Sequence, residues 1–179
     1  MSKINLRALT SVDIEKTIQW HNQSDISDLY SGHPFPVNIE MERKWYEKIL
    51  ISNFPTTVFG IELIESKKLI GITVLRNINL INRVAEFAMY VGDKNERGKG
   101  YGKEAVLQTI EFGFFKLGLN RIFIKVLEDN ITTKKLHESI GFSVEGILRM
   151  SVYKNNSYRN EFILGILKDE FIKKNTEKK

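Results

Sequence analysis

Three closely spaced glycines, Gly98, Gly100 and Gly102, stand between an apolar stretch ending near Val91 and an amphipathic stretch beginning at Tyr101. Glycine permits backbone conformations and close approaches that side chains block. At the start of a helix, unpaired backbone N–H groups converge, and the positive end of the helix favours an anion. The chain is therefore expected to form a strand–turn–helix unit that can bind phosphate.

Arg97, Lys99 and Lys103 surround these glycines and add positive charge, so we predict a pyrophosphate as the bound anion. The glycine spacing matches neither a Walker loop nor the dinucleotide-binding fingerprint, which argues against nucleotide hydrolysis. The alternative is a solvated turn with ordinary basic residues around it.

Hydrophobic periodicity predicts the other elements. In chain order, we expect a strand over 4–9, helices over 11–21 and 40–51, strands over 56–64, 69–75 and 84–91, a helix over 101–117, a strand over 121–127, a helix over 132–139, and strands over 143–153 and 159–167. Three strands in succession indicate an antiparallel meander. The order predicts a mixed α/β (α+β) fold rather than an all-parallel doubly wound sheet, which disfavours a Rossmann fold.

Length and composition favour one globular domain, because the chain has 179 residues of which 42% are hydrophobic and 27% charged. We assign residues 1–172 to that domain and 173–179 to a polar tail. There is no membrane-spanning run and no signal-peptide pattern near the N-terminus, so we expect a cytoplasmic protein with no membrane partner.

Charge and residue usage narrow the function classes. The net charge of +5 is spread along the chain and lies partly in the tail, so it favours a small phosphorylated ligand over nucleic acid. A basic nucleic-acid-binding protein remains the rival. The chain has no cysteine and only three well-separated histidines, and we expect no thiol chemistry and no metal site.

The segment Arg97-Gly98-Lys99-Gly100-Tyr101-Gly102 resembles the Arg/Gln-x-x-Gly-x-Gly/Ala motif of the GNAT N-acetyltransferase superfamily. A second stretch, from Asn130 through 136–142, is similar to the family's Asn…Leu-Tyr/His-Glu-x-x-Gly-Phe segment. Residues 82–87 are similar to the RimJ/RimL-like branch, which includes ribosomal-protein N-terminal, spermidine and amino-sugar acetyltransferases. The resemblance covers nearly the whole chain.

The resemblance implies a GNAT fold, a twisted and mostly antiparallel sheet of about seven strands flanked by about four helices. It implies acetyl-CoA as co-substrate, with the extended pantetheine arm pairing with the strand edge near Met89 and Val91 and contacting Asn130. The pyrophosphate would be held by Arg97, Gly98, Lys99, Gly100, Tyr101, Gly102 and Lys103.

Direct transfer to an amine requires loss of a proton from the attacking nitrogen and a proton for the departing thiolate. Glu86 is the candidate base, because a carboxylate in an apolar strand is costly unless it faces a polar cleft or finds a partner. The alternative is an edge-exposed or salt-bridged glutamate. Water could relay the proton.

His137 stands where many relatives have a tyrosine that is commonly assigned as the acid. A histidine donates only as imidazolium, so we consider His137 as proton donor or thiol contact, and alternatively as a packing or cofactor-lining residue. Tyr101 and Tyr153 are further candidate donors.

The acceptor site is predicted on the loop and helix after the first helix, where acidic groups would attract a cationic amine. Its candidate residues are Tyr30, His33, Phe35, Glu40 and Glu42. The alternative for Glu40 and Glu42 is an outer, solvated helix face.

We therefore predict an N-acetyltransferase that moves acetyl to a primary amine of a small molecule, a polyamine or an amino sugar. The alternatives are a protein N-terminal acetyltransferase and a non-catalytic acyl-CoA-binding module. The sequence leaves the oligomeric state open, a homo-oligomer included.

Overall fold

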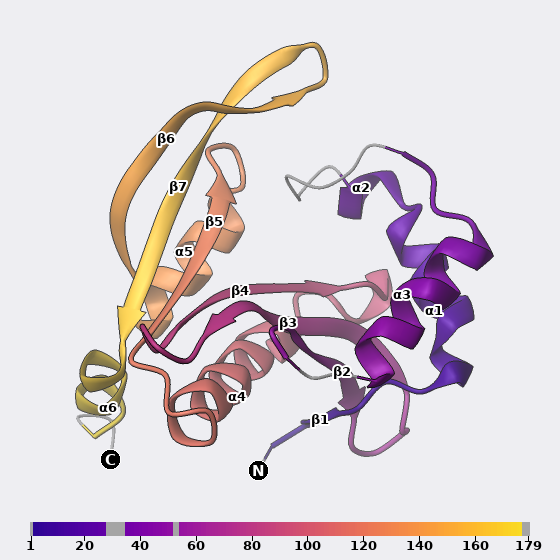
Figure 1. Cartoon of the computed structure of the whole chain (residues 1–179), viewed down its shortest axis with the longest axis horizontal. Coiled ribbons are helices and arrows are strands. Elements are labelled where there is room, and N and C mark those ends of the chain that lie inside the picture. The colour runs from indigo at the N-terminus through magenta and orange to yellow at the C-terminus, as the bar shows by residue number, and fades with distance from the viewer. Residues whose placement is uncertain (1, 28–34, 52–53, 177–179) are drawn as a thin grey trace.

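The computed structural model describes residues 2–27, 35–51 and 54–176 (Figure 1). Its helices and strands are β1 (Ile4–Arg7), α1 (Ile14–His21), α2 (Ser24–Ser27), α3 (Ile39–Ile51), β2 (Thr57–Leu63), β3 (Leu69–Asn79), β4 (Val84–Val91), α4 (Tyr101–Phe115), β5 (Arg121–Leu127), α5 (Ile131–Ile140), β6 (Ser143–Lys154), β7 (Ser157–Leu167) and α6 (Lys168–Thr176). Short 3-10 turns precede α1 and α4, over Ser11–Asp13 and Lys94–Glu96. In the described ranges no helix is long and apolar enough to cross a membrane.

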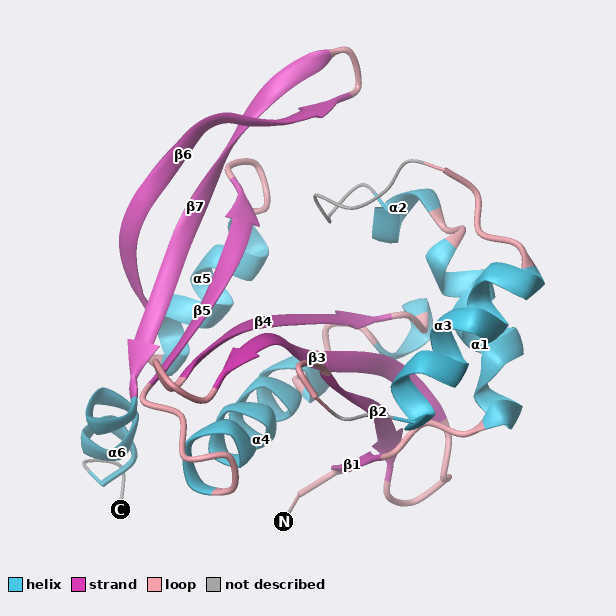
Figure 2. Cartoon of the chain, viewed as in Figure 1, coloured by secondary structure: helices cyan, strands magenta, loops and turns pink. Residues whose placement is uncertain are grey.

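The strands form one sheet in the order β1-β2-β3-β4-β5-β7-β6. Every neighbouring pair is antiparallel except β4 and β5, which run parallel. The predicted mixed, mostly antiparallel sheet of seven strands is confirmed. Figure 2 shows β6 and β7 extending beyond the other strands as a long hairpin, which we call the β6–β7 arm (residues 143–167).

Alternate side chains of a strand point to opposite faces of the sheet, and helices cover both faces of the central strands. On one face, Phe87, Ile124 and Leu164 pack with Val106 and Ile110 of α4 in the largest core cluster. On the other face, residues of β2 to β4 pack against Trp20 of α1 and Tyr46 of α3. The even-numbered side chains of β4, Glu86 among them, therefore point away from α4.

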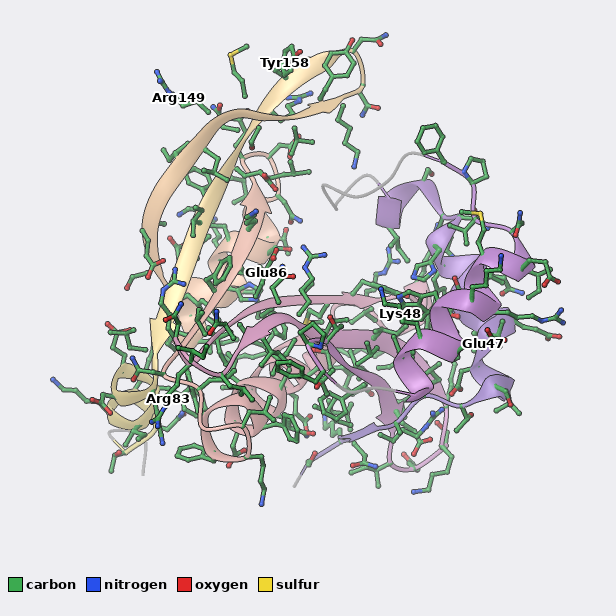
Figure 3. All side chains as sticks on the ribbon, viewed as in Figure 1. Glu47, Lys48, Arg83, Glu86, Arg149 and Tyr158 are labelled. Carbon is green, nitrogen blue, oxygen red and sulfur yellow. The ribbon has the colours of Figure 1, made fainter. Side chains whose placement is uncertain are left out.

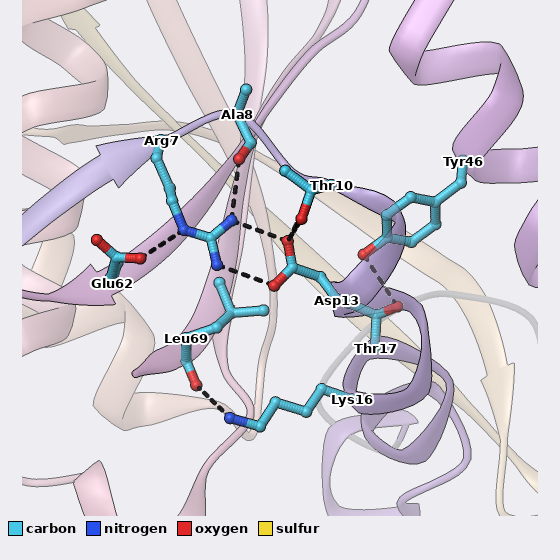
Figure 4. A network of polar contacts seen from close by, with 9 residues as sticks. All are labelled: Arg7, Ala8, Thr10, Asp13, Lys16, Thr17, Tyr46, Glu62 and Leu69. Carbon is cyan, nitrogen blue, oxygen red and sulfur yellow. Dashed lines mark hydrogen bonds and ion pairs between the residues drawn. The ribbon is translucent and has the colours of Figure 1, made fainter. Parts of the chain in front are cut away.

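Ion pairs join the first helix to the sheet (Figure 4). The Arg7 guanidinium on β1 donates two hydrogen bonds of 2.8 Å to the Asp13 carboxylate and one of 2.6 Å to Glu62 on β2. Burial of the Asp13 carboxyl acts against its ionisation, but the bonds from Arg7 and Thr10 outweigh it and lower the pKa of Asp13. This network fixes the start of α1 beside β1 and β2.

The partial pairing of β4 with β5 leaves a gap in the sheet. Strands β4 and β5 pair only from Val84–Glu86 to Arg121–Phe123, after which they diverge. Their remaining residues, 87–91 and 124–127, form the two sides of a wedge-shaped gap. A parallel pair that separates part-way exposes backbone N–H and C=O groups that need other partners.

Two helices were not predicted, and several boundaries differ from the prediction: β1 ends at Arg7 instead of residue 9, β3 continues to Asn79 instead of ending at residue 75, and α4 ends at Phe115 instead of residue 117. The single turn α2 buries Ile26, and α6 includes residues 173–176, which were expected in the polar tail. Helix α6 forms because Phe171 is buried against Phe114, at 5.6 Å between ring centroids, and because the Leu167 N–H is capped by Glu170. Single apolar residues on short segments leave no periodic pattern to read.

Candidate functional site

A cavity of about 490 Å³ occupies the gap between β4 and β5. Its walls come from residues 86–91 of β4, 124–127 of β5, the start of α5, and residues of the turn before α4. From the cofactor-binding prediction the lining includes Met89, Val91, Arg97, Gly98, Gly100, Gly102, Lys103 and Asn130, and it lacks Lys99 and Tyr101. The volume is within the range of small-molecule sites.

Residues 97–103, which we call the glycine turn, include the turn before α4 and the first three residues of that helix, and two of their glycines have left-handed backbone conformations. Gly98 has φ of 75° and Gly100 has φ of 88°, and Gly100 is the N-cap of α4. A Cβ on either residue would meet no atom within 4 Å, so conformation rather than space requires glycine there. At Gly102 a Cβ would lie 3.5 Å from the Met89 side chain, which brings the first turn of α4 close to β4.

The basic side chains of the glycine turn are partly engaged within the protein. Arg97 Nε donates to the Val91 carbonyl at 2.8 Å, and Lys99 Nζ pairs with Glu96 at 2.8 Å. Hydrogen bonds from Lys99 and then Lys68 lower the pKa of Glu96. Arg97 therefore ties the turn to the end of β4, which leaves the backbone amides at the start of α4 and Lys103 to face an anion.

Asn130 lies at the opposite wall of the cavity and caps α5. Its Oδ1 accepts from the Thr133 N–H at 3.2 Å, so its amide nitrogen is the part of the side chain that can donate to a ligand.

Glu86 lines the cavity and is 5% exposed. Figure 3 shows its side chain on β4, on the same side of that strand as the β6–β7 arm in this view. Arg76 Nη2 donates to Oε1 at 2.7 Å and Asn77 Nδ2 to Oε2 at 3.1 Å. The structure thus shows a salt-bridged glutamate that also faces the cavity, and each oxygen can accept a further hydrogen bond.

His137 is fully buried on α5 and also lines the cavity. Its Nδ1 lies 2.8 Å from the Thr133 carbonyl, which assigns the proton to Nδ1, and its ring packs against Phe87 and Phe142. Burial lowers the pKa of His137, and the Thr133 hydrogen bond only partly opposes this shift. The neutral ring therefore presents Nε2 as an acceptor, and Nε2 has no hydrogen-bond partner.

The three predicted acceptor residues that the structure describes do not line the cavity. Phe35 is 70% exposed, Glu40 pairs with Arg43 at the surface of α3, and neither they nor Glu42 line it. Tyr30 and His33 lie outside the described residues. The outer-face assignment thus fits Glu40, while Glu47 of α3 is likewise exposed (Figure 3).

For Glu42 the outer-face expectation was wrong, because this carboxylate is 1% exposed. It accepts a hydrogen bond from Thr17 and lies 2.8 Å from His21 Nδ1, while His21 Nε2 lies 3.1 Å from the Tyr90 hydroxyl. Thr17 and His21 of α1 face α3 and are the polar partners of Glu42, which the helical periodicity of α3 alone could not indicate. Glu42 thus connects both helices to Tyr90, which lines the cavity.

Sequence reasoning missed Glu161 of β7. This carboxylate is 5% exposed and lines the cavity; its Oε2 accepts from Ser151 Oγ at 2.9 Å and its Oε1 has no hydrogen-bond partner. The available signal was a carboxylate beside the apolar Phe162 and Ile163, which is the same argument that selected Glu86.

A family model described as "Acetyltransferase (GNAT) domain" matches residues 3–143. The chain belongs to the GNAT acetyltransferase family. The resemblance to this family is therefore confirmed. The prediction that the protein is an acetyl-CoA-dependent N-acetyltransferase is confirmed as well.

The chain is 28% identical over 171 residues to the spermidine N(1)-acetyltransferase of Vibrio cholerae, covering 96% of both chains. The crystal structure of a Vibrio cholerae spermidine N-acetyltransferase in complex with CoA and spermine matches with a TM-score of 0.89 and 27% identity, over 96% of this chain and 99% of that one. A dodecameric structure of that enzyme matches with a TM-score of 0.82 and 25% identity, over 97% and 99% of the two chains. The GNAT fold is thereby confirmed.

Proposed function

We propose that this enzyme transfers acetyl from acetyl-CoA to a primary amine of a small cationic molecule, a polyamine before an amino sugar, by direct attack and without a metal ion. The observation that carries the proposal is the glycine turn, which opens onto a cavity with a buried carboxylate on each of two strands. The similarity to enzymes named for spermidine supports the choice of a polyamine.

The coenzyme's diphosphate would bind at the glycine turn. Backbone N–H groups at the start of α4, together with the Lys103 ammonium, offer donors and positive charge there. Arg97 contributes indirectly, because its guanidinium holds the turn against the carbonyls of Val91 and Gly92.

The pantetheine arm would lie in the gap between β4 and β5. Past Glu86, β4 has no pairing with β5, so the backbone near Met89 and Val91 has polar groups on that side for the arm's amides. Asn130 would donate from the β5 side. An N–H of β4 directed at the thioester carbonyl would stabilise the negative charge that develops on its oxygen during attack.

Transfer forms a C–N bond and breaks the C–S bond, so one proton must leave the nitrogen and the sulfur must gain one. We propose Glu86 as the base, directly or through a water molecule. Its bonds to Arg76 and Asn77 hold it in one orientation while each oxygen keeps room for a further donor.

His137 is proposed as the thiol contact. Because its neutral Nε2 is an acceptor, it suits a hydrogen bond from the S–H of the product coenzyme better than protonation of the thiolate. The proton that reaches sulfur would then come from the attacking amine through Glu86 or water. Tyr153 is 64% exposed and does not line the cavity, and Tyr101 is likewise absent from its lining.

A homo-oligomer is part of the proposal, since a similar enzyme forms dodecamers. Sedimentation velocity of the purified chain tests this part, and a monomer at micromolar concentration would contradict it.

The test of the activity is coenzyme A release from acetyl-CoA with a panel of acceptors. Polyamines are expected to give the largest kcat/KM, ahead of amino sugars and of peptides with a free N-terminus. Turnover of peptides alone would assign a protein N-terminal acetyltransferase. Tight binding of acetyl-CoA with no turnover of any acceptor would indicate a binding module.

A further inference from the structure

Among the described residues, only three buried side-chain polar atoms have no hydrogen-bond partner, and two of their residues, Glu161 and His137, line the cavity. Leaving a buried polar atom unpaired costs free energy, and the cost is greater for a charged group. Such atoms at a binding cavity indicate groups that a ligand pairs with. For Glu161 the group is a carboxylate oxygen, which accepts hydrogen bonds and attracts cations.

The face of the sheet that bears Glu161 follows from strand register. Leu164 is buried in the core cluster that contains residues of α4 and α5, and Phe162 packs against that cluster. Because side chains alternate along a strand, Glu161 points to the opposite face of the sheet. Glu86 points to that face as well, because its neighbour Phe87 belongs to the same core cluster. Both carboxylates therefore lie on the face away from α4.

The two carboxylates are too far apart to serve one nitrogen atom. Glu86 is in register with Phe123 on β5, while Glu161 is in register with Leu127, further along the same strand. At strand rise these positions are separated by roughly 13 Å along β5, and β4 and β7 lie on opposite sides of it. If Glu86 accepts the proton of the reacting amine, Glu161 faces a different part of the acceptor.

We propose that Glu161 binds a second, non-reacting ammonium group of the acceptor, so the enzyme selects linear diamines and polyamines over monoamines. The inference rests on the proposed function and specifies its substrate class. Ser151 donates to Oε2 and orients the carboxylate, leaving Oε1 for the ligand. A cation that replaces water at this buried oxygen gains a charge-assisted hydrogen bond.

The experiment compares diaminooctane, a linear diamine long enough to reach from Glu86 towards Glu161, with the amino alcohol of the same chain length, which has a hydroxyl in place of the second ammonium. Wild-type enzyme is expected to prefer diaminooctane in kcat/KM, mainly through KM. Glu161→Gln is expected to lower kcat/KM for diaminooctane roughly 10- to 100-fold and to change that for the amino alcohol much less. Glu145→Gln is the matched control, because it removes a half-exposed carboxylate from the adjoining strand β6 and is expected to change neither value.

Thermal unfolding separates this role from a structural one. Glu161→Gln keeps an acceptor for Ser151 and removes an unpaired buried charge, so its melting temperature is expected to equal or exceed that of the wild type. A lower melting temperature together with equal losses for both acceptors would overturn the proposal. So would wild-type kcat/KM values that do not differ between the two acceptors.

If no amine is acetylated, the proposed function fails, and calorimetry then decides on Glu161 separately. Titration of diaminooctane into wild-type enzyme is expected to give binding that Glu161→Gln weakens. Equal binding to both proteins would overturn the assignment of Glu161.

Discussion

The two sides of the cavity are built in different ways. On the side proposed for the coenzyme, a contiguous segment of seven residues, 97–103, presents backbone amides at the start of one helix. On the side proposed for the acceptor, the polar groups are side chains of β4 and β7 that come from distant parts of the chain. Backbone recognition depends on local conformation, while side-chain recognition depends on how separate elements pack. Substitutions on the two sides should therefore change different quantities, the affinity for acetyl-CoA on one side and the turnover of acceptors on the other.

The largest effect is expected for Gly100→Val. Its φ of 88° is unfavourable for a β-branched residue, so the turn would change conformation and its amides would no longer converge. We expect the Kd for acetyl-CoA, measured by calorimetry, to rise about 100-fold or more. Gly118→Val is the matched control, because Gly118 also has a positive φ of 68° but lies at the far end of α4. The Gly118→Val control should lose stability and keep its affinity for acetyl-CoA. If Gly100→Val also kept its affinity for acetyl-CoA, the glycine turn would be excluded as the diphosphate site.

For Glu86→Gln we expect a smaller effect, on kcat rather than on the affinity for acetyl-CoA. Loss of the base should lower kcat by roughly 10²-fold, most strongly at low pH where fewer amines are free, and should leave acetyl-CoA affinity within about twofold. Glu62→Gln provides the comparison, since Glu62 is also paired with an arginine but lies on β2, outside the cavity lining. A pH–rate profile identical to that of the wild type would exclude Glu86 as the base.

Burial of His137 should make the free energy of unfolding depend on pH. Its pKa is lowered in the folded state, so between that value and about 6.5 the unfolded chain binds the extra proton. The free energy of unfolding therefore falls as pH drops below about 6.5, by up to roughly 1.4 kcal/mol per pH unit from this group. Chemical denaturation at pH 7 and pH 5 should show a steeper loss for the wild type than for His137→Phe. Equal slopes would mean that His137 is protonated in the folded protein.

The smallest effect is expected for Lys99→Ala. Its ammonium is half exposed, pairs with Glu96 and does not line the cavity, so the Kd for acetyl-CoA should change less than about fivefold. Lys103→Ala, which alters a lining residue of the same charge, is expected to have the larger effect. A greater loss for Lys99→Ala would show that side-chain charge rather than backbone geometry dominates binding at the turn.

The same contrast explains what the sequence could predict. The glycine turn, the succession of helices and strands along the chain, and the need of Glu86 for a polar partner were accessible, because each depends on local conformation or on period-two patterning. The apolar neighbours of Glu161 hinted at its burial, but its place at the cavity and the burial of Glu42 were not accessible. Glu42 is buried because Thr17 and His21 of another helix meet it, and Glu161 reaches the cavity only because β7 lies beside β5. Such contacts follow from tertiary packing, which a single sequence leaves open.

The separation of β4 from β5 has a consequence for any extended molecule bound between them. Because strand backbones offer hydrogen-bonding groups at fixed intervals, a guest that pairs with β4 can shift only in whole steps of that repeat. With one end anchored at the start of α4, the distance to its other end is set by its own length. The gap would thus fix where the thioester lies, and a carrier arm shorter or longer than the natural one would place its thioester carbon away from an amine bound at Glu86.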